Sequence, residues 1–339
     1  HMGEFEMMKK TTSALAVAAL LGTGAASAAT FQISDDTSLT VGGDIQYAYY
    51  DVTGGNGNSA TNFTDNGSSL VFAGEQTHAN GITTSFYLDF DEFGSLGGAN
   101  SNNEITDADD GNNATDNSSI TDDEYHIAFA GDFGMVKIGN EGDVGGAAFD
   151  VADVAEGTGL NLPEGGASTE VIQYYGNAVN GVSFAVQAQV AGDEQTGSST
   201  SLGAFVEADL GQVTLGAAYD DRANDGDEAT YALMAGTAIG GVNLTANFVS
   251  QDDGSNNEQD ETFTALAADY SYGPGSIYGV LQSYSIDNVA ADAQDDFTQY
   301  LVGVNYSITS NAYVYGEVSS QDRDNDENDT MVAGVVYSW

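Results

Sequence analysis

The sequence predicts an all-β fold, a sixteen-stranded antiparallel transmembrane β-barrel with short turns at one end and long loops at the other. Three observations predict it. Apolar and polar residues alternate over segments of about ten residues, short and long connections alternate along the chain, and the acidic residues within strands keep to one face. The composition agrees, because 43 glycines and two prolines suit strands and tight turns better than helices.

The alternation is clear in the first predicted strand, residues 39–50. Ile45 and Tyr47 share one face, and Asp44 and Gln46 share the other. One face of each such strand suits lipid and the other suits water. The pattern recurs in sixteen segments, at 39–50, 69–77, 82–90, 123–130, 134–140, 170–177, 182–191, 201–210, 213–220, 229–238, 242–251, 262–272, 276–286, 297–308, 312–321 and 329–339.

The connections between these segments are of two kinds. Seven are short, and several carry the Asn-Gly or Gly-Gly pair that a tight hairpin needs, as at Asn80-Gly81 and Gly240-Gly241. This asymmetry is typical of outer-membrane barrels, whose long loops lie outside the cell. Eight are longer, at 51–68, 91–122, 141–169, 192–200, 221–228, 252–261, 287–296 and 322–328.

Charge restricts the partners and the environment. There are 52 acidic residues against five basic ones, giving a net charge of −47, which excludes nucleic acid as a partner. Such self-repulsion is tolerable at about 1 M salt, where the Debye length is roughly 3 Å, so we expect a halophilic or marine bacterium as the source. The chain has no cysteine, and this excludes a disulfide or a cysteine metal site.

The charged residues within strands predict a water-filled lumen. Each lies opposite the more apolar face, as Lys137 does between Val136 and Ile138. A base on the lipid face would cost about 2–4 kcal/mol at mid-membrane. The expected lumen residues are Asp44, Glu75, Asp89, Glu124, Lys137, Glu207, Asp209, Asp269 and Glu317. Tyrosines near strand ends are expected in the interfacial girdles, namely Tyr49, Tyr125, Tyr278, Tyr306 and Tyr337.

The N-terminus resembles a vector scar followed by an export signal. Residues 1–6 are the predicted scar, and residues 7–28 are the predicted signal peptide, removed from the mature protein. Lys9 and Lys10 precede a short apolar run, and Ala28 ends a small-residue cleavage site. Residues 29–339 are then a single barrel domain of an exported protein.

The region from Gly139 to Gln189 resembles the constriction-loop region of the trimeric general porins of Gram-negative bacteria. Its loop carries Leu162-Pro163-Glu164-Gly165-Gly166, where that family has Leu-Pro-Glu-Phe-Gly-Gly, and a strand-turn-strand follows. The resemblance implies a third loop, about 141–169, that folds into the barrel. It implies Glu164 at the narrowest point, with Asp143, Asp150, Asp153 and Glu156 as further loop acids. It also implies a homotrimer in outer-membrane lipid and lipopolysaccharide.

Two departures from that family concern charge. Asn140 stands where the family has an arginine, and Lys137 is the only base within a predicted strand. The transverse field across the pore should therefore be weak, and a pore ringed by acids should favour cations. Screening should reduce this preference at high salt. A third departure is Trp339, where the family more often ends in phenylalanine.

These features predict passive diffusion of ions and small hydrophilic solutes, with no catalysis and no cofactor. One alternative is a solute-selective porin, although neither an aromatic slide nor a basic ladder is evident. Another is a barrel acting as an adhesin or an enzyme, although no G-x-S-x-G motif is present. Asp322, Asp324 and Asp326 imitate the start of an EF-hand loop, but Glu327 replaces its glycine, so only weak Ca²⁺ or Mg²⁺ binding is expected there. The isolated His78 and His126 have no metal-ligand spacing.

Overall fold

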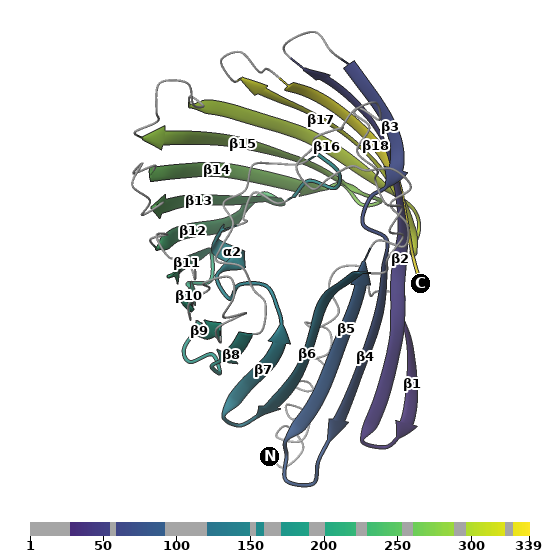
Figure 1. Ribbon diagram of the computed structural model, residues 1–339, viewed down its shortest axis with the longest axis vertical. Helices are drawn as coiled ribbons and strands as arrows, with labels where there is room; N and C mark the ends of the chain where they lie inside the picture. The colour runs from purple at the N-terminus through teal and green to yellow at the C-terminus, as the bar shows by residue number, and fades with distance from the viewer. Residues whose placement is uncertain are drawn as a thin grey trace, which may run out of the picture.

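A computed structural model of the protein shows the strands arranged in a ring (Figure 1). The structure describes residues 28–54, 59–91, 121–149, 154–158, 171–189, 201–221, 229–252, 260–287, 296–322 and 328–339. The predicted scar and signal peptide lie outside these residues. None of the helices in the described part of the chain is long and apolar enough to cross a membrane.

The described residues form eighteen strands in one antiparallel sheet. Two short strands, β1 (Ala29–Ser34) and β3 (Ser59–Asp65), both pair with β2. The other sixteen form the wall and correspond one for one to the predicted strands: β2 (Thr37–Gly54), β4 (Ser69–Thr77), β5 (Thr83–Asp91), β6 (Thr121–Gly131), β7 (Gly134–Asn140), β8 (Val171–Tyr175), β9 (Val182–Gln189), β10 (Ser201–Asp209), β11 (Val213–Asp220), β12 (Thr230–Ile239), β13 (Val242–Asp252), β14 (Asp260–Ser271), β15 (Ser276–Asp287), β16 (Phe297–Thr309), β17 (Ala312–Asp322) and β18 (Asn328–Ser338).

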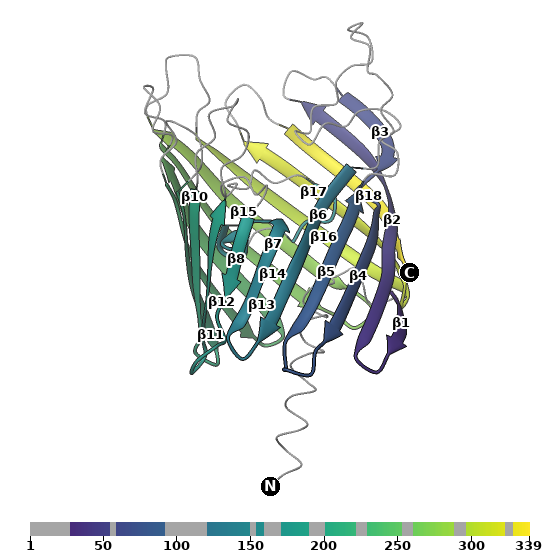
Figure 2. The same ribbon diagram turned by 60° about the horizontal axis from the view of Figure 1, so that its bottom comes forward.

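The barrel closes where the last strand meets the first wall strand. β18 pairs antiparallel with β2, with Val335 opposite Tyr47, and we call this junction the seam. Trp339 follows β18 and donates its backbone N–H to the carbonyl of Gly43 at 3.0 Å. Figure 2 shows β18 beside β2, with the C-terminus near the hairpin of β1 and β2. Closure leaves no unpaired edge in the wall, and this confirms the predicted fold.

The strand β2 has different neighbours along its 18 residues. Its first part pairs with β1 and β4, and its later part pairs with β18 and β3. The connection predicted at 51–68 thus contains β3, and a hairpin strand precedes the first predicted strand. Each short strand pairs with a part of β2 whose N–H and C=O groups would otherwise form an unpaired edge.

Side chains sort to two faces as the alternation predicts. On β2, Ile45 is 48% exposed on the outer face, whereas Asp44 on the inner face is 7% exposed. Four of the five predicted girdle tyrosines also lie on the outer face: Tyr49, Tyr125, Tyr306 and Tyr337. The prediction for Tyr278 is wrong. It is buried on the inner face, because it shares the phase of Val280 and not that of the outward Leu281.

Tight turns form where the sequence supplies residues that tolerate positive φ. Asn180 and Gly181 have φ values of 54° and 80°, and Gly240 and Gly241 have 62° and 88°. Two successive positive φ values match the right-handed twist of the flanking strands. These pairs therefore fix the register of β8–β9 and β12–β13 at the short-turn end.

The inner face is not uniformly polar. Phe263, Tyr284 and Phe297 form an aromatic row across β14, β15 and β16, with ring centroids 4.6 and 4.7 Å apart. A one-turn helix, α2 (Gly146–Phe149), lies inside the ring and packs on the apolar cluster that contains this row (Figure 1). The inner wall therefore has an apolar patch on which α2 packs.

Candidate functional site

The third loop is the candidate functional site, and two parts of it lie among the described residues. We call residues 141–149 the root segment and residues 154–158 the inner segment. Both contact inward-facing side chains of the wall strands. Of the predicted loop acids, Asp143 and Glu156 fall in these segments, whereas Asp150, Asp153 and Glu164 lie outside the described residues.

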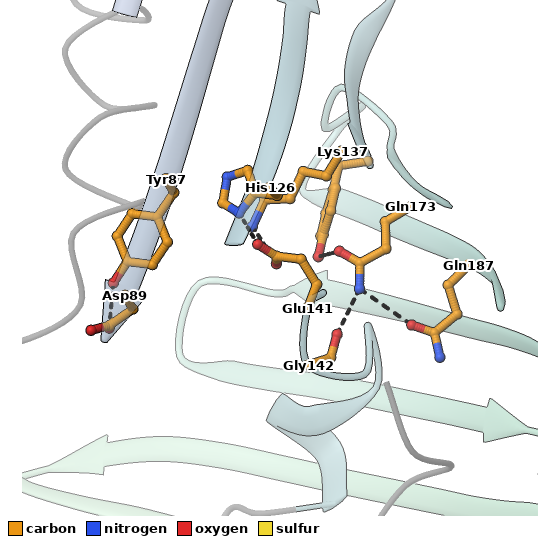
Figure 3. A network of polar contacts seen from close by, with 9 residues as sticks. Tyr87, Asp89, His126, Lys137, Glu141, Gly142, Gln173 and Gln187 are labelled. Carbon is orange, nitrogen blue, oxygen red and sulfur yellow. Dashed lines mark hydrogen bonds and ion pairs between the residues drawn. The ribbon is translucent and has the colours of Figure 1, made fainter. Parts of the chain in front are cut away.

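The root segment begins with an ion-paired carboxylate (Figure 3). Glu141 is buried; it pairs with Lys137 at 2.7 Å and also contacts Nδ1 of His126. The ring of His126 stacks on Tyr87, and Lys137 lies 5.7 Å from the ring centroid of Tyr175. Burial opposes the ionisation of Glu141, but His126 and the charge of Lys137 outweigh it, so the pKa of Glu141 lies below its usual value.

Two glutamines of the wall hold the backbone of the root segment. The Nε2 of Gln173 donates to the carbonyl of Gly142 at 2.6 Å and to Gln187 Oε1 at 3.3 Å. The same Gln187 oxygen accepts the N–H of Val144 at 3.0 Å. Both glutamines are buried, so each of these bonds is shielded from competing water.

Gln187 also reaches across a neighbouring strand. Its Nε2 donates to Asp220 on β11 at 3.1 Å, although β10 lies between the two strands. Gly203 on β10 makes this reach possible, because a Cβ there would lie 2.7 Å from Cγ of Gln187. A chain of amide and carboxylate groups thus crosses β8 to β11 beneath the root segment.

The helix α2 is held by one aromatic side chain and one amide. Phe149 is almost fully buried in a cluster with Ala218 and Val249. The Nδ2 of Asn247 donates to the carbonyl of Phe149 at 2.6 Å, and its Oδ1 accepts the N–H of Ala265 at 3.1 Å. A single side chain therefore links the loop backbone to the middle of β14.

The inner segment is bound by one buried carboxylate of the wall. Glu317, on β17, accepts the N–H groups of Glu156, Gly157 and Thr158 at 2.5, 3.0 and 2.7 Å. It also accepts the hydroxyl of Thr158 at 2.5 Å and that of Tyr278 at 2.7 Å. Five donors satisfy both oxygens of a side chain that is only 2% exposed. Glu317 is buried on the inner side of the wall, where it contacts the loop.

The carboxylate of Glu156 binds wall residues other than Glu317. Its carboxylate accepts the hydroxyl of Tyr313 at 2.7 Å and Nδ2 of Asn305 at 3.3 Å. Its carbonyl accepts Nδ2 of Asn66 at 2.9 Å. The inner segment is therefore contacted by residues from both sides of the seam.

The other predicted lumen acids all share the phase of inward-facing residues. Asp44 accepts Ser69 Oγ at 2.8 Å, and Asp269 accepts Nδ2 of Asn243 at 2.6 Å. Tyr87 donates to Asp89 at 2.9 Å. Glu75, Glu124, Glu207 and Asp209 also lie on the inward face of their strands.

The loop acid Asp143 has a local partner. It accepts the N–H of Gly145 at 2.6 Å and so shapes the root segment.

Four amides that hold the loop were not among the predicted site residues: Asn66, Gln173, Gln187 and Asn247. Three of them lie on the polar face of predicted strands. This position predicts that the side chain points inward, but it does not predict which group the side chain binds. Lys137 is the only lysine or arginine among the described residues, and it is paired with Glu141. The same part of the chain holds no group of three or more His, Cys, Asp or Glu residues able to bind a metal ion.

Comparison with known proteins agrees with this architecture. A monosaccharide porin of Halomonas sp. and the major outer membrane protein of Halomonas elongata are each 26% identical over 98% of this chain and 100% of the relative. An anion-selective porin from Comamonas acidovorans superposes with a TM-score of 0.73 at 16% identity, over 90% of this chain and all of that one. A trimer form of OmpT from Vibrio cholerae gives 0.64 at 15%, with the same coverage.

The family comparison extends over nearly the whole chain. The description "Gram-negative porin" applies to the family whose model matches residues 12–326. This match confirms the resemblance to the porins of Gram-negative bacteria. The chain therefore belongs to the Gram-negative porin family and is an outer-membrane channel, not an enzyme.

Proposed function

We propose that this porin is a cation-preferring channel for ions and small hydrophilic solutes. One observation carries the proposal: Lys137, the one basic Lys or Arg side chain among the described residues, is ion-paired with Glu141. Inward-facing acids such as Glu75 and Glu207 therefore face no basic ladder within the described wall. A lumen with this charge raises the local concentration of cations and lowers that of anions.

The fold shared with the Comamonas anion-selective porin does not argue against this preference. At 16% identity the likeness shows the fold alone. Selectivity depends on the charged side chains that line the pore, and barrels of one architecture can carry either sign.

The third loop, residues 141–169, is the proposed constriction. Its described segments already occupy the interior, bound at Glu141, Phe149 and Glu156. We assign Asp150, Asp153 and Glu164, together with Asp143, to its charged rim. A loop fixed in this way restricts the radius while the side chains facing the opening set the charge.

Single-channel recording in a salt gradient tests the cation preference. Purified protein in a planar bilayer, with about tenfold more KCl on one side, should give a reversal potential of the sign that cation permeation produces. That potential should shrink as both solutions are made more concentrated, because salt screens the pore charges. A reversal potential of the opposite sign would refute the proposal.

A second candidate is the passage of neutral sugars. The Halomonas relative named as a monosaccharide porin covers almost the whole chain, and buried amides line part of the interior. Swelling of protein-containing vesicles in isosmotic glucose, compared with a trisaccharide, would measure this activity. Each swelling rate is divided by the free diffusion coefficient of its sugar. Equal corrected rates for the two sugars would argue against selectivity for monosaccharides.

The remaining assignments concern export and assembly. We propose that residues 7–28 direct export, that residues 29–339 form the mature barrel, and that the long loops face the outside of a halophilic or marine cell. We also propose a homotrimer embedded in lipid and lipopolysaccharide. Intact-mass measurement of the mature protein tests the cleavage site before Ala29, and the mass of the detergent-solubilised complex tests the trimer.

A further inference from the structure

The turn between β3 and β4 occupies a special place in the wall. At this turn the strand paired with β2 changes from β4 to β3. Asp44 of β2 pairs with Ser69 of β4, and Tyr47 of β2 pairs with Asp65 of β3. Gln46 lies between these pairs. The backbone N–H of Gln46 donates to Ser68 Oγ at 3.0 Å, and its carbonyl accepts the backbone N–H of Asn66 at 3.2 Å.

The turn itself is held in one shape. Asp65 Oδ1 accepts the N–H groups of Gly67 and Ser68 at 3.1 and 2.8 Å, and the hydroxyl of Ser68 donates to the other oxygen of Asp65 at 2.5 Å. Gly67 supplies the positive φ of 89° that this geometry requires. A rigid backbone thus presents the side chain of Asn66 to the interior.

The side-chain amide of Asn66 forms hydrogen bonds to interior groups. Its Nδ2 donates to the carbonyl of Glu156 at 2.9 Å and to the hydroxyl of Tyr315 at 3.0 Å. Its Oδ1 accepts the hydroxyl of Tyr50, on β2. One side chain from the beginning of the barrel therefore contacts the inner segment and a strand from the end of the barrel.

The inner segment also passes over the last strand. A Cβ on Gly157 would lie 2.9 Å from Cγ1 of Val332, on β18. Glu317 on β17 holds the same segment from the far side. The segment is therefore held on one side of the seam by Glu317 and on the other by Asn66.

We propose that Asn66 is a positioning residue for the constriction, which ties the inner segment to the first strands so that the third loop bridges the seam. The inference rests on the proposed role of the third loop as the constriction. Glu317 holds the segment against the last strands, and Asn66 connects it to the first ones. Losing Asn66 should free one end of the segment while the wall stays closed.

The absence of cysteine allows a direct test of this position. Ala155 lies in the inner segment and packs on the cluster that contains Val280 and Leu301. An Ala155→Cys variant, folded in lipid, should react slowly with a small water-soluble methanethiosulfonate. Adding Asn66→Ala should increase the reaction rate roughly fivefold, because it removes the bond to the carbonyl of Glu156 and a hydrogen bond worth about 1 kcal/mol corresponds to that factor.

Three further variants in the Ala155→Cys background make the result decisive. Asn243→Ala removes another inward amide that binds a lumen acid, Asp269, and should leave the rate unchanged. Glu317→Gln should raise the rate, since it weakens the opposite attachment. If Asn66→Ala does not fold, Asn66→Asp keeps an acceptor for Tyr50 but lacks both donors, and it should raise the rate as well.

An unchanged rate in the Asn66 variants, with a raised rate in Glu317→Gln, would overturn the proposal, because the last strands would then hold the segment alone. A raised rate in Asn243→Ala would also overturn it, since any loss of an inward amide would have the same effect. The reversal potential of the same preparations reports the cation preference separately. A failure of either proposal is thus distinguishable from a failure of the other.

Discussion

The carboxylate of Glu317 accepts both the backbone N–H and the hydroxyl of Thr158, at 2.7 and 2.5 Å, across 159 positions of the chain. A fully buried anion is costly unless donors surround it, and here the loop backbone supplies them. The buried Glu317 carboxylate and the attached inner segment therefore stabilise each other in the folded state. Attachment of the third loop is thus part of the folding energy of the barrel.

Replacing Glu317 with glutamine should destabilise the folded barrel by about 2–3 kcal/mol, because charge-assisted bonds to three N–H groups become weaker and the amide NH₂ faces donors. Urea unfolding in lipid vesicles, followed by intrinsic fluorescence, measures the change. Glu207→Gln removes the same charge from an inward position outside the third-loop contacts and should change stability by less than about 0.5 kcal/mol. Equal losses in both variants would contradict this account of Glu317.

Gly303 provides a second test, because the ring of Tyr278 lies where its Cβ would be. A Cβ there would approach Cε2 of Tyr278 to 2.2 Å, and the displaced ring would lose its bond to Glu317. Gly303→Ala should therefore cost about 1–3 kcal/mol. In Gly316→Ala the new methyl meets only the carbonyl of Val332 at 3.8 Å, so this control should unfold like the wild type in the same urea titration.

Acid should release the root segment. The folded-state pKa of Glu141 lies below its ordinary value of 4.5, so its pairing with Lys137 contributes stability above about that pH and loses it as the pH falls through the lower folded value. Many other acids titrate in the same range, so the informative quantity is the difference between the wild type and Glu141→Gln. The difference in unfolding free energy should shrink as the pH falls below about 4.5. A difference that grows in acid would contradict this sign.

Phe149 should account for much of the attachment of α2. Truncation to alanine removes an almost fully buried ring from the cluster with Val249 and should cost about 3–5 kcal/mol if the cavity does not collapse. Phe149→Leu fills most of the space and should cost less than half as much. Urea unfolding gives the stabilities, and current noise in single-channel recordings reports whether the loop is freed. Equal stability of the alanine variant and the wild type would show that the ring packs without benefit.

Cation preference should depend on which face of a strand carries a charge. Glu75→Lys changes the inward charge by two units and should lower the permeability ratio of K⁺ to Cl⁻ by roughly two- to fourfold at low salt. Gln76→Lys adds a base one position along, on the opposite and exposed face. Reversal potentials should change in the first variant only. A similar change in both would mean that total charge, and not lumen charge, sets the selectivity.

Much of this fold follows from local pattern. Alternation of apolar and polar residues predicts which face of each strand lies against lipid, as for Ile45 beside Asp44 or Leu281 beside Gln282. A charged side chain has a high free energy in lipid and a low one in water. Turn chemistry at Asn180-Gly181 then sets the register between neighbours. The porin resemblance and the sixteen wall strands were therefore accessible from the sequence.

The partners of the inward residues were not accessible in this way. Alternation predicts that Glu317 faces inward, but it does not predict that residues 156–158, more than 150 positions earlier, bind it. Likewise, Asn66 lies in a connection that shows no strand periodicity, and only barrel closure brings it to Tyr315 and Glu156. The sequence by itself determined the faces of the strands, because each face depends on immediate neighbours along the chain. The tertiary structure alone decided which inward groups hold the third loop, because those contacts depend on closure of the whole barrel.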